Sequence, residues 1–165
     1  MKVLITGSSN GIGLQIAKEL FNLKYELVLH YNSTVDNLKK NFGSSHDNIH
    51  YIQADLSNDK GADFLYDETV KKIGMPDAII NNAGIAESSP IEKDINLWAK
   101  EFDKTINVNL KSPAIICKQF ISYKRTQKID KILRIVNIAS RAAFRGEVED
   151  FISYASSKGG LISLT

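Results

Sequence analysis

The sequence predicts an α/β fold with a doubly wound parallel sheet that helices cover on both faces. Short runs of β-branched and apolar residues alternate with longer segments of helical periodicity, which is typical of repeated βαβ units. Each short run is almost continuously apolar, as expected for strands that are buried on both faces. Because crossovers between parallel strands are right-handed, we expect the strand order 3-2-1-4-5, with the switch point between the first and fourth strands.

The elements are expected to follow one another without a linker or a repeat. Strands are expected at residues 3–6, 27–30, 49–54, 78–81 and 132–139. Helices are expected at residues 12–23, 34–42, 58–73 and 95–124, the last interrupted near 109–113, and a further helix begins near Ser153. Ligands bind such sheets at the carboxyl ends of the strands beside the switch point. The segments at those ends are TGSSNGIG and NNAG.

Composition indicates an ordinary soluble globular protein with a cytoplasmic location. The chain has 165 residues, of which 43% are hydrophobic and 24% charged, and its net charge of +2 is spread along the sequence. This pattern argues against a nucleic-acid or membrane partner. The apolar run at the N-terminus is too short for a signal peptide. The single Cys117 reads as a buried thiol, and the three histidines lack metal-ligand spacing, so we expect no metal site.

A glycine-rich loop from Thr6 to Gly13 follows the first predicted strand and opens a predicted helix. This is where a dinucleotide-binding loop must lie to work. We expect Gly7 to permit the tight turn, Gly11 to let the backbone approach a pyrophosphate, and Gly13 to let the helix pack closely on the sheet. The alternative is a glycine-rich turn that binds no ligand.

The glycine spacing of this loop, together with NNAG at Asn81–Gly84 and YASSK at Tyr154–Lys158, resembles the short-chain dehydrogenases/reductases, particularly the 3-oxoacyl-[acyl-carrier-protein] reductases. The resemblance covers Val3 to Thr165. It implies that residues 1–165 form a single NAD(P)-binding Rossmann domain, incomplete at its C-terminus. It also implies hydride transfer between a nicotinamide cofactor and a small-molecule carbonyl or secondary alcohol, for which a 3-oxoacyl thioester is one candidate.

The cofactor contacts follow from the same resemblance. The residues expected to make them are Gly7, Ser9, Asn10, Gly11, Ile12, Gly13, Tyr31, Asn32, Ser33, Asp55, Leu56, Asn82, Ala83, Gly84, Tyr154 and Lys158. Asp55 matches the position that meets the adenine amino group, although an aspartate that caps the following helix is the alternative. Asn81 and Asn82 could instead be simple turn formers.

The end of the second strand favours NADP(H) over NAD(H). Tyr31, Asn32 and Ser33 stand where NAD-preferring enzymes commonly carry an acidic residue, and the next acid is Asp36. Nothing there repels a 2'-phosphate. The preference is weakened because Asn10 replaces an arginine found in many NADP-using relatives.

Four residues are expected to react with or orient the substrate. Tyr154 and Lys158 are four residues apart, so they share one face of a helix. A phenol ionises near pH ~10, and a neighbouring ammonium lowers that value. The resemblance implies that Tyr154 donates a proton to the carbonyl oxygen, that Ser140 orients the substrate, and that Lys158 holds the nicotinamide ribose. It makes Asn109 the fourth catalytic residue. The alternatives are that Tyr154 is an aromatic residue on a helix surface, that Lys158 is a solvated charge, that Ser140 is a turn residue at a strand end, and that Asn109 lies at a helix kink.

Two further expectations come from the C-terminal region. Thirteen residues separate Ser140 from Tyr154, one more than in many relatives. Among them, Arg141, Phe144 and Arg145 could form a wall of the substrate site. The alternative is that the two arginines pair with local acids, namely Glu147, Glu149 or Asp150. The family fold normally continues for roughly another third of the chain, adding strands that complete the sheet. A truncated, noncatalytic nucleotide-binding fragment is therefore the alternative function, and a homodimer or homotetramer is expected if the full-length chain exists.

Overall fold

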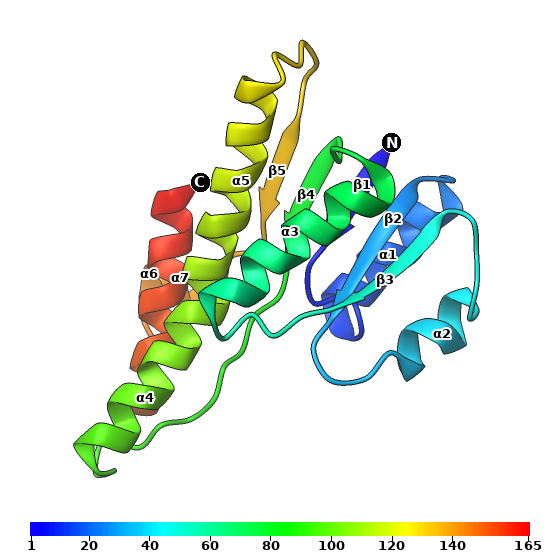
Figure 1. The fold of residues 1–165 in the computed structure, drawn as a ribbon. Coiled ribbons are helices and arrows are strands. Elements are labelled where there is room, and N and C mark those ends of the chain that lie inside the picture. The colour runs from blue at the N-terminus through cyan, green and yellow to red at the C-terminus, as the bar shows by residue number, and fades with distance from the viewer.

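Five parallel strands form the centre of the computed structural model, which describes residues 1–165 (Figure 1). They are β1 (Lys2–Ile5), β2 (Glu26–Tyr31), β3 (Ile49–Gln53), β4 (Ala78–Asn81) and β5 (Arg134–Asn137). Their order in the sheet is β3-β2-β1-β4-β5. The predicted fold class, strand order and switch point between β1 and β4 are therefore confirmed. In register, Leu4 of β1 lies between Val28 of β2 and Ile79 of β4.

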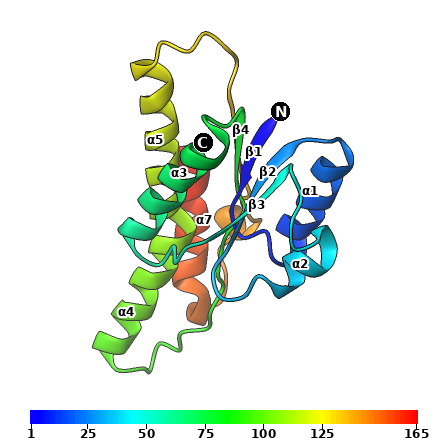
Figure 2. The ribbon, with the colours of Figure 1, turned by 45° about the vertical axis from the view of Figure 1, so that its right-hand side comes forward.

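Helices cover both faces of this sheet. They are α1 (Gly11–Asn22), α2 (Asp36–Phe42), α3 (Asp59–Ile73), α4 (Ile95–Ile106), the π-helical η1 (Asn107–Lys111), α5 (Ser112–Thr126), α6 (Ala142–Arg145), the 3₁₀ segment η2 (Glu149–Phe151) and α7 (Ile152–Leu164). Figure 2 shows α1 and α2 on one side of the sheet, with α3, α4, α5 and α7 on the other. None of these helices combines the length and the apolar character that a membrane crossing requires.

The core has two layers because side chains alternate along each strand. Leu4, Val28 and Ile79 pack toward α3 and α5, where Phe120 is 1% exposed. The residues between them in the strands pack toward α1 and α2; this second set includes Val3, Ile5, Leu27, Leu29 and Ile80. Burial on both faces explains why the strands read as continuous apolar runs. The apolar core thereby fixes the strand ends on which the cavity described below is built.

The observed elements differ from the predicted ones at β5 and in two short helical segments, α6 and η2, that were not predicted. β5 spans four residues, fewer than the apolar run 132–139, because its partner β4 ends at Asn81. The predicted interruption of the helix 95–124 near residues 109–113 is confirmed, since η1 divides this helix and Asn109 lies inside η1. Pro113 follows at the start of α5 and lacks the N–H that would bond the carbonyl of Asn109. The helical interruption thus has a covalent cause.

Candidate functional site

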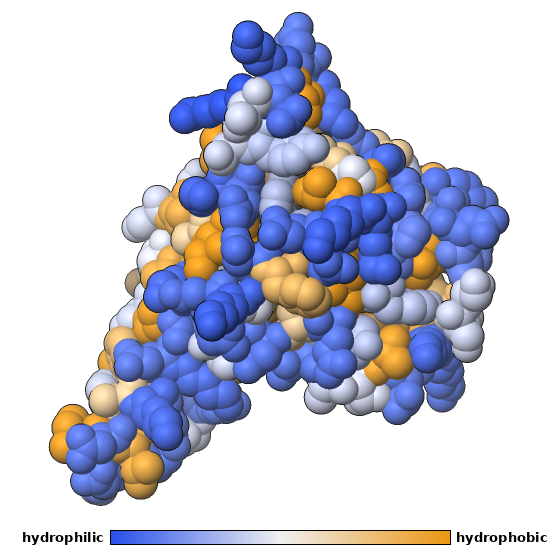
Figure 3. Space-filling view, viewed as in Figure 1, coloured by the Kyte–Doolittle hydropathy of each residue, from blue (hydrophilic) through white to orange (hydrophobic).

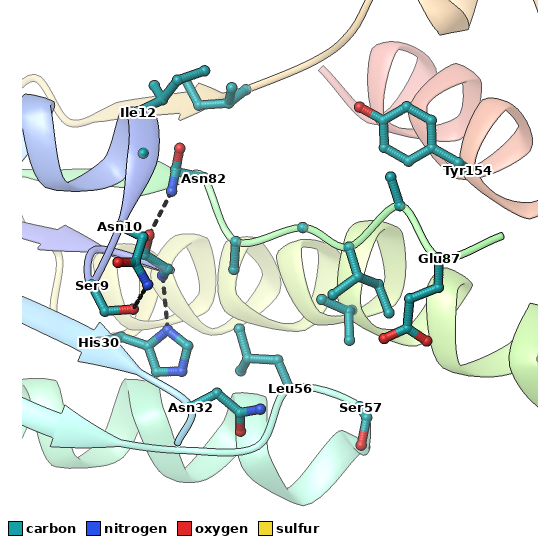
Figure 4. Close-up of a pocket in the computed structure, with 18 of the residues that line it drawn as sticks. Ser9, Asn10, Ile12, His30, Asn32, Leu56, Ser57, Asn82, Glu87 and Tyr154 are labelled. Carbon is teal, nitrogen blue, oxygen red and sulfur yellow. Dashed lines mark hydrogen bonds between the residues drawn. The ribbon is translucent and has the colours of Figure 1, made fainter. Parts of the chain in front are cut away.

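A cavity of about 550 Å³ opens at the carboxyl ends of the strands, beside the switch point (Figure 4). Of the residues expected to bind a cofactor or react, those that line it are Gly7, Ser9, Asn10, Gly11, Ile12, Asn32, Asp55, Leu56, Asn82, Ala83, Gly84, Tyr154 and Lys158. Those outside its lining are Gly13, Tyr31, Ser33, Asn109 and Ser140. The structure therefore brings three separate motifs together around one space.

The glycines of the first loop each meet a different steric demand. Gly7 has φ +63°, and a Cβ added there would lie 2.7 Å from the Cα of Ala83, so a side chain has no room. A Cβ on Gly13 would lie 2.3 Å from Gly7 O, which makes Gly13 a packing residue. Gly11 also has positive φ, +54°, but nothing lies within 4 Å of its Cβ position. The loop is closely packed at Gly7 and Gly13 and open at Gly11, where a ligand can approach the backbone of the loop.

Hydrogen bonds join this loop to the NNAG segment. The Thr6 hydroxyl accepts from the backbone N–H groups of Asn82 (3.0 Å) and Ala83 (2.9 Å). In return, the Asn82 side-chain amide donates to the carbonyl oxygens of Thr6 (3.0 Å) and Gly7 (2.9 Å). Asn82 is thus more than a turn former, and Thr6 is a site-building residue that sequence reasoning missed. Its position at the end of a strand beside the switch point was the available signal.

The N-terminus of α1 has no capping side chain. Asn10 occupies the N-cap position, but its side chain makes no capping bond; it accepts instead from Asn37 Nδ2 at 3.0 Å. The first N–H groups of a helix lack intrahelical partners and carry partial positive charge. Gly11 and Ile12, in that first turn, line the cavity. The residues present therefore fit a phosphate group.

Asp55 forms a tight turn at the edge of the cavity. Its exposed carboxylate accepts from the Ser57 N–H (2.9 Å) and the Ser57 hydroxyl (2.8 Å), and the first of these bonds is the main reason that the pKa of Asp55 lies below its ordinary value. The following helix, α3, is capped by Asn58, whose side chain accepts from Gly61 N at 3.0 Å. The alternative that Asp55 caps this helix is therefore wrong.

Tyr154 and Lys158 enter the cavity from α7, and they lie on one face as their spacing predicts. Lys158 is only 4% exposed, and this burial lowers the pKa of its ammonium group. The lysine Nζ donates to the carbonyl of Ile138 at 2.8 Å and lies 5.9 Å from the centroid of the Tyr154 ring. An ammonium group has three donors, so two remain for a ligand. A Cβ on Gly84 would lie 3.4 Å from Nζ, which shows how closely the NNAG segment approaches the lysine.

Asn109 is fully buried behind the cavity and does not line it. Its side chain accepts from Ile85 N and donates to Ile85 O, both at 2.8 Å, and donates to the Ser157 hydroxyl at 3.0 Å. That hydroxyl donates in turn to the carbonyl of Tyr154 at 2.7 Å. Asn109 therefore connects the wall after β4 to the helix that carries Tyr154, through a serine that sequence reasoning missed.

Ser140 lies outside the cavity lining, although its neighbours Ile138 and Ala139 are part of it. β5 ends at Asn137, and the chain then turns into α6, where the Ser140 hydroxyl accepts from Ala142 N at 3.2 Å. The fifth strand therefore ends at Asn137, before its predicted end at residue 139, and Ser140 does not directly follow it. In the same region Arg145 forms an ion pair with Glu147 at 3.0 Å, as the alternative to a substrate wall predicts.

Three further cavity residues carry polar or charged groups to which sequence reasoning assigned no role. His30 is 2% exposed, and burial lowers its pKa to about 4. Glu87 and Lys104 form an ion pair at 2.8 Å between the segment after β4 and helix α4. The histidine had been considered only as a metal ligand. Its position near the end of a strand at the ligand edge of the sheet was the better indication that it lies at the cavity.

Curated relatives match nearly the whole chain. The (2S)-[(R)-hydroxy(phenyl)methyl]succinyl-CoA dehydrogenase subunit BbsD of Thauera aromatica is 32% identical over 98% of this chain and 63% of its own length. The 3-oxoacyl-[acyl-carrier-protein] reductase FabG of Rickettsia bellii is 30% identical over 98% of this chain and 62% of its own length. The chain therefore spans less than two thirds of the length of these relatives.

Solved structures agree with these matches. A 4-hydroxyisoleucine dehydrogenase complexed with NADH superposes with a TM-score of 0.86 at 28% identity, covering 99% of this chain and 64% of that one. A blue fluorescent protein from a metagenomic library, in complex with NADPH, has a TM-score of 0.81 at 22% identity over 99% of this chain and 65% of that one, and shows likeness of fold alone. The family model described as short chain dehydrogenase matches residues 1–165, so the chain belongs to the short-chain dehydrogenase/reductase family.

Proposed function

We propose that this chain carries the cofactor-binding and reacting groups of an NAD(P)(H)-dependent oxidoreductase that interconverts a carbonyl and a secondary alcohol. The observation that supports this most strongly is that Tyr154 and Lys158 line the same cavity as the glycine-rich loop. A proton donor and a dinucleotide-binding loop around one space are what this reaction requires.

The residues divide the work as follows. The bound nicotinamide supplies the hydride. Tyr154 donates its phenolic proton to the carbonyl oxygen during reduction and takes it back during oxidation. Lys158, buried and with two N–H donors to spare, holds ligand hydroxyl groups beside the tyrosine. Asn109 fixes the position of α7 through Ser157, and Gly84 leaves room for the ammonium group. Ser140 completes the proposed catalytic set, and it would have to turn from Ala142 toward the cavity.

NADP(H) is the proposed preferred cofactor. Asn32 lines the cavity at the end of β2, with Tyr31 and Ser33 on either side of it, and none of these side chains is acidic. The nearest acid along the chain, Asp36, accepts a hydrogen bond from the Thr34 hydroxyl at 2.6 Å. A 2'-phosphate at this strand end therefore meets amide and hydroxyl donors and no carboxylate repulsion. Among the solved structures of this fold, one is complexed with NADH and another with NADPH.

The proposed substrate is a 3-oxoacyl thioester. Support comes from relatives at 26–30% identity named acetoacetyl-CoA reductase and 3-oxoacyl-[acyl-carrier-protein] reductase. This support is an analogy between proteins, since the site itself does not select an acyl chain.

Cofactor titration followed by turnover tests the function. NADPH and NADH are titrated against the chain by nicotinamide fluorescence, with tighter binding of NADPH expected. Oxidation of NADPH by acetoacetyl-CoA and by a simple ketone is then followed by absorbance. Tyr154→Phe should retain NADPH binding and lose about 100-fold or more in kcat, since it removes the proton donor. Turnover that survives in this variant would sink the assigned mechanism.

Binding without turnover is the second candidate function. One observation favours it: the Ser140 hydroxyl is engaged with Ala142 N and is absent from the cavity lining. Tight NADPH binding with no oxidation by either substrate would select this function over the first.

A homodimer or homotetramer is proposed for the protein. Figure 3 shows apolar side chains at a projecting end of the molecule, where α4 lies in Figure 1. Ile95 and Leu97, in the first turn of α4, are 69% and 56% exposed, and Ile91, shortly before this helix, is 53% exposed. Large apolar side chains gathered in one exposed place are typical of interaction surfaces. Sedimentation of the chain with and without Leu97→Glu measures the association, and a monomer in both cases would contradict the proposal.

A further inference from the structure

His30 is an unusual residue for its place in the sheet. It is the fifth residue of β2, between a fully buried leucine and Tyr31, and it is itself 2% exposed. The rest of the buried stretch of this strand is leucine and valine. An imidazole costs free energy in such a position unless both of its nitrogens are hydrogen-bonded.

Both ring nitrogens of His30 have partners, and each partner lies on a different loop. The Gly7 N–H donates to Nδ1 at 2.9 Å, which Figure 4 marks with a dashed line. On the other side, Nε2 lies 3.0 Å from the carbonyl oxygen of Ala54. Because a backbone N–H can only donate, Nδ1 must be unprotonated, and Nε2 must carry the hydrogen that it donates to Ala54. The contacts therefore specify one neutral tautomer.

The backbone of His30 holds the same loop a second time. Its carbonyl oxygen accepts from the N–H and from the hydroxyl of Ser8, both at 2.9 Å. Two successive loop residues, Gly7 and Ser8, are thus anchored to one residue of β2. No other hydrogen bond satisfies the Gly7 N–H, whose residue sits at φ +63°. Without the imidazole, a turn that only glycine can make would have a free amide at its start.

We propose that His30 is a positioning residue that sets the dinucleotide-binding loop through the Gly7 amide, and thereby sets the affinity of the chain for NADPH. The inference rests on the proposed cofactor role of the cavity. The imidazole fixes the distance between the loop after β1 and the turn after β3, which form two walls of that cavity. A shift of either wall misplaces the helix N-terminus that fits phosphate.

Two amide variants separate the two bonds of the ring. In His30→Asn the side-chain oxygen can occupy the place of Nδ1 and accept from Gly7, whereas the bond to Ala54 is lost. In His30→Gln the terminal amide can reach the place of Nε2 and donate to Ala54, whereas the acceptor for Gly7 is lost. Each variant removes one hydrogen bond of a buried ring, so each serves as the stability control for the other.

The expected result is a split between affinity and stability. Both variants lose comparable stability toward urea. NADPH affinity stays within about threefold of wild type in His30→Asn and falls about tenfold in His30→Gln, as loss of one loop contact predicts. The proposal is overturned if the two variants lose NADPH affinity equally, or if the loss of affinity in each variant is proportional to its loss of stability.

Measurements on the wild-type chain without cofactor provide a test that does not depend on NADPH binding or on the folding of a variant. Nitrogen NMR of the histidine rings should show His30 with Nδ1 unprotonated, and hydrogen exchange should be slow at the Gly7 amide and fast at the uncapped Gly11 amide. A protonated Nδ1, or a Gly7 amide that exchanges as fast as that of Gly11, contradicts the positioning role. If these results hold but NADPH fails to bind, the proposed function fails and the loop anchor stands.

Discussion

Mild acid should destabilise this protein through His30. Burial lowers the pKa of this histidine from its ordinary 6.5 to about 4, and both of its nitrogens are engaged when the ring is neutral. Between these two values the unfolded chain binds a proton that the folded chain excludes. The contribution of His30 to stability is therefore complete above pH ~6.5, is lost as the pH falls, and stops changing below pH ~4.

The size of the effect follows from the separation of the two pKa values. They differ by about 2.5 pH units, and each unit corresponds to about 1.36 kcal/mol, so the loss at pH 4 is about 3 kcal/mol. By pH 5 the loss already reaches about 2 kcal/mol. A loss of this size is a large fraction of the ~5–15 kcal/mol by which ordinary proteins are stable.

A difference measurement isolates this histidine from the carboxylates that titrate nearby. Urea unfolding is measured for the wild type and for His30→Asn, whose side chain does not titrate, at several values from pH 7 to pH 4.5. The wild-type advantage in unfolding free energy should shrink by about 2 kcal/mol between pH 7 and pH 5. A wild-type advantage that is constant over this range would refute the reasoning, since it would mean that His30 accepts a proton as readily in the folded state as in the unfolded state.

Four substitutions test contacts in the glycine-rich loop, at the start of α3 and behind the cavity. Gly7→Ala should cost about 2–4 kcal/mol of unfolding free energy, because its Cβ would meet the backbone of Ala83 at 2.7 Å. Gly11→Ala should cost about 1 kcal/mol, because only its positive φ opposes a side chain. Equal losses of the two variants in urea unfolding would contradict the steric explanation. Asn58→Ala removes the cap of α3 and should cost about 1 kcal/mol, and an unchanged thermal midpoint would argue against that cap. Asn109→Ala removes three hydrogen bonds at a fully buried site and should cost about 2–4 kcal/mol by calorimetry; a loss under ~0.5 kcal/mol would show that these bonds are dispensable.

The sheet could be predicted from the sequence because its signals are local and repeated. Burial on both faces leaves continuous apolar runs such as Leu27–Leu29, and the handedness of crossovers then restricts the strand order. The convergence of the glycine-rich loop, NNAG and the pair Tyr154 and Lys158 could be predicted for a related reason. Parallel strands place their carboxyl ends at one edge, so motifs that follow those strands meet there.

The remaining features depend on contacts between distant segments, for which the sequence has no periodic signal. Thr6 bonds the chain some 76 residues later, and His30 bonds both Gly7 and Ala54. Ser140 was misplaced because the apolar run continues to Ala139 while the pairing of β5 stops with β4 at Asn81. Strand length in this case is decided by the partner strand and not by local propensity.

The hydrogen bonds divide the cavity into two halves with separate supports. The half that contains the glycine-rich loop depends on Thr6, His30 and Asn82, which tie the loop after β1 to β2, β3 and β4. The half that carries Tyr154 depends on Asn109 and the π-helical segment, which hold α7 against the wall after β4. No side chain of one set bonds a side chain of the other. The two sets come together along the segment after β4, at Asn82 and Ile85, and at the turn after β3, where Asn107 of the π-helical segment donates to Ser57 O at 3.0 Å. Loss of a support on one side should therefore leave the other in place, because the sheet between them is held by its own apolar core.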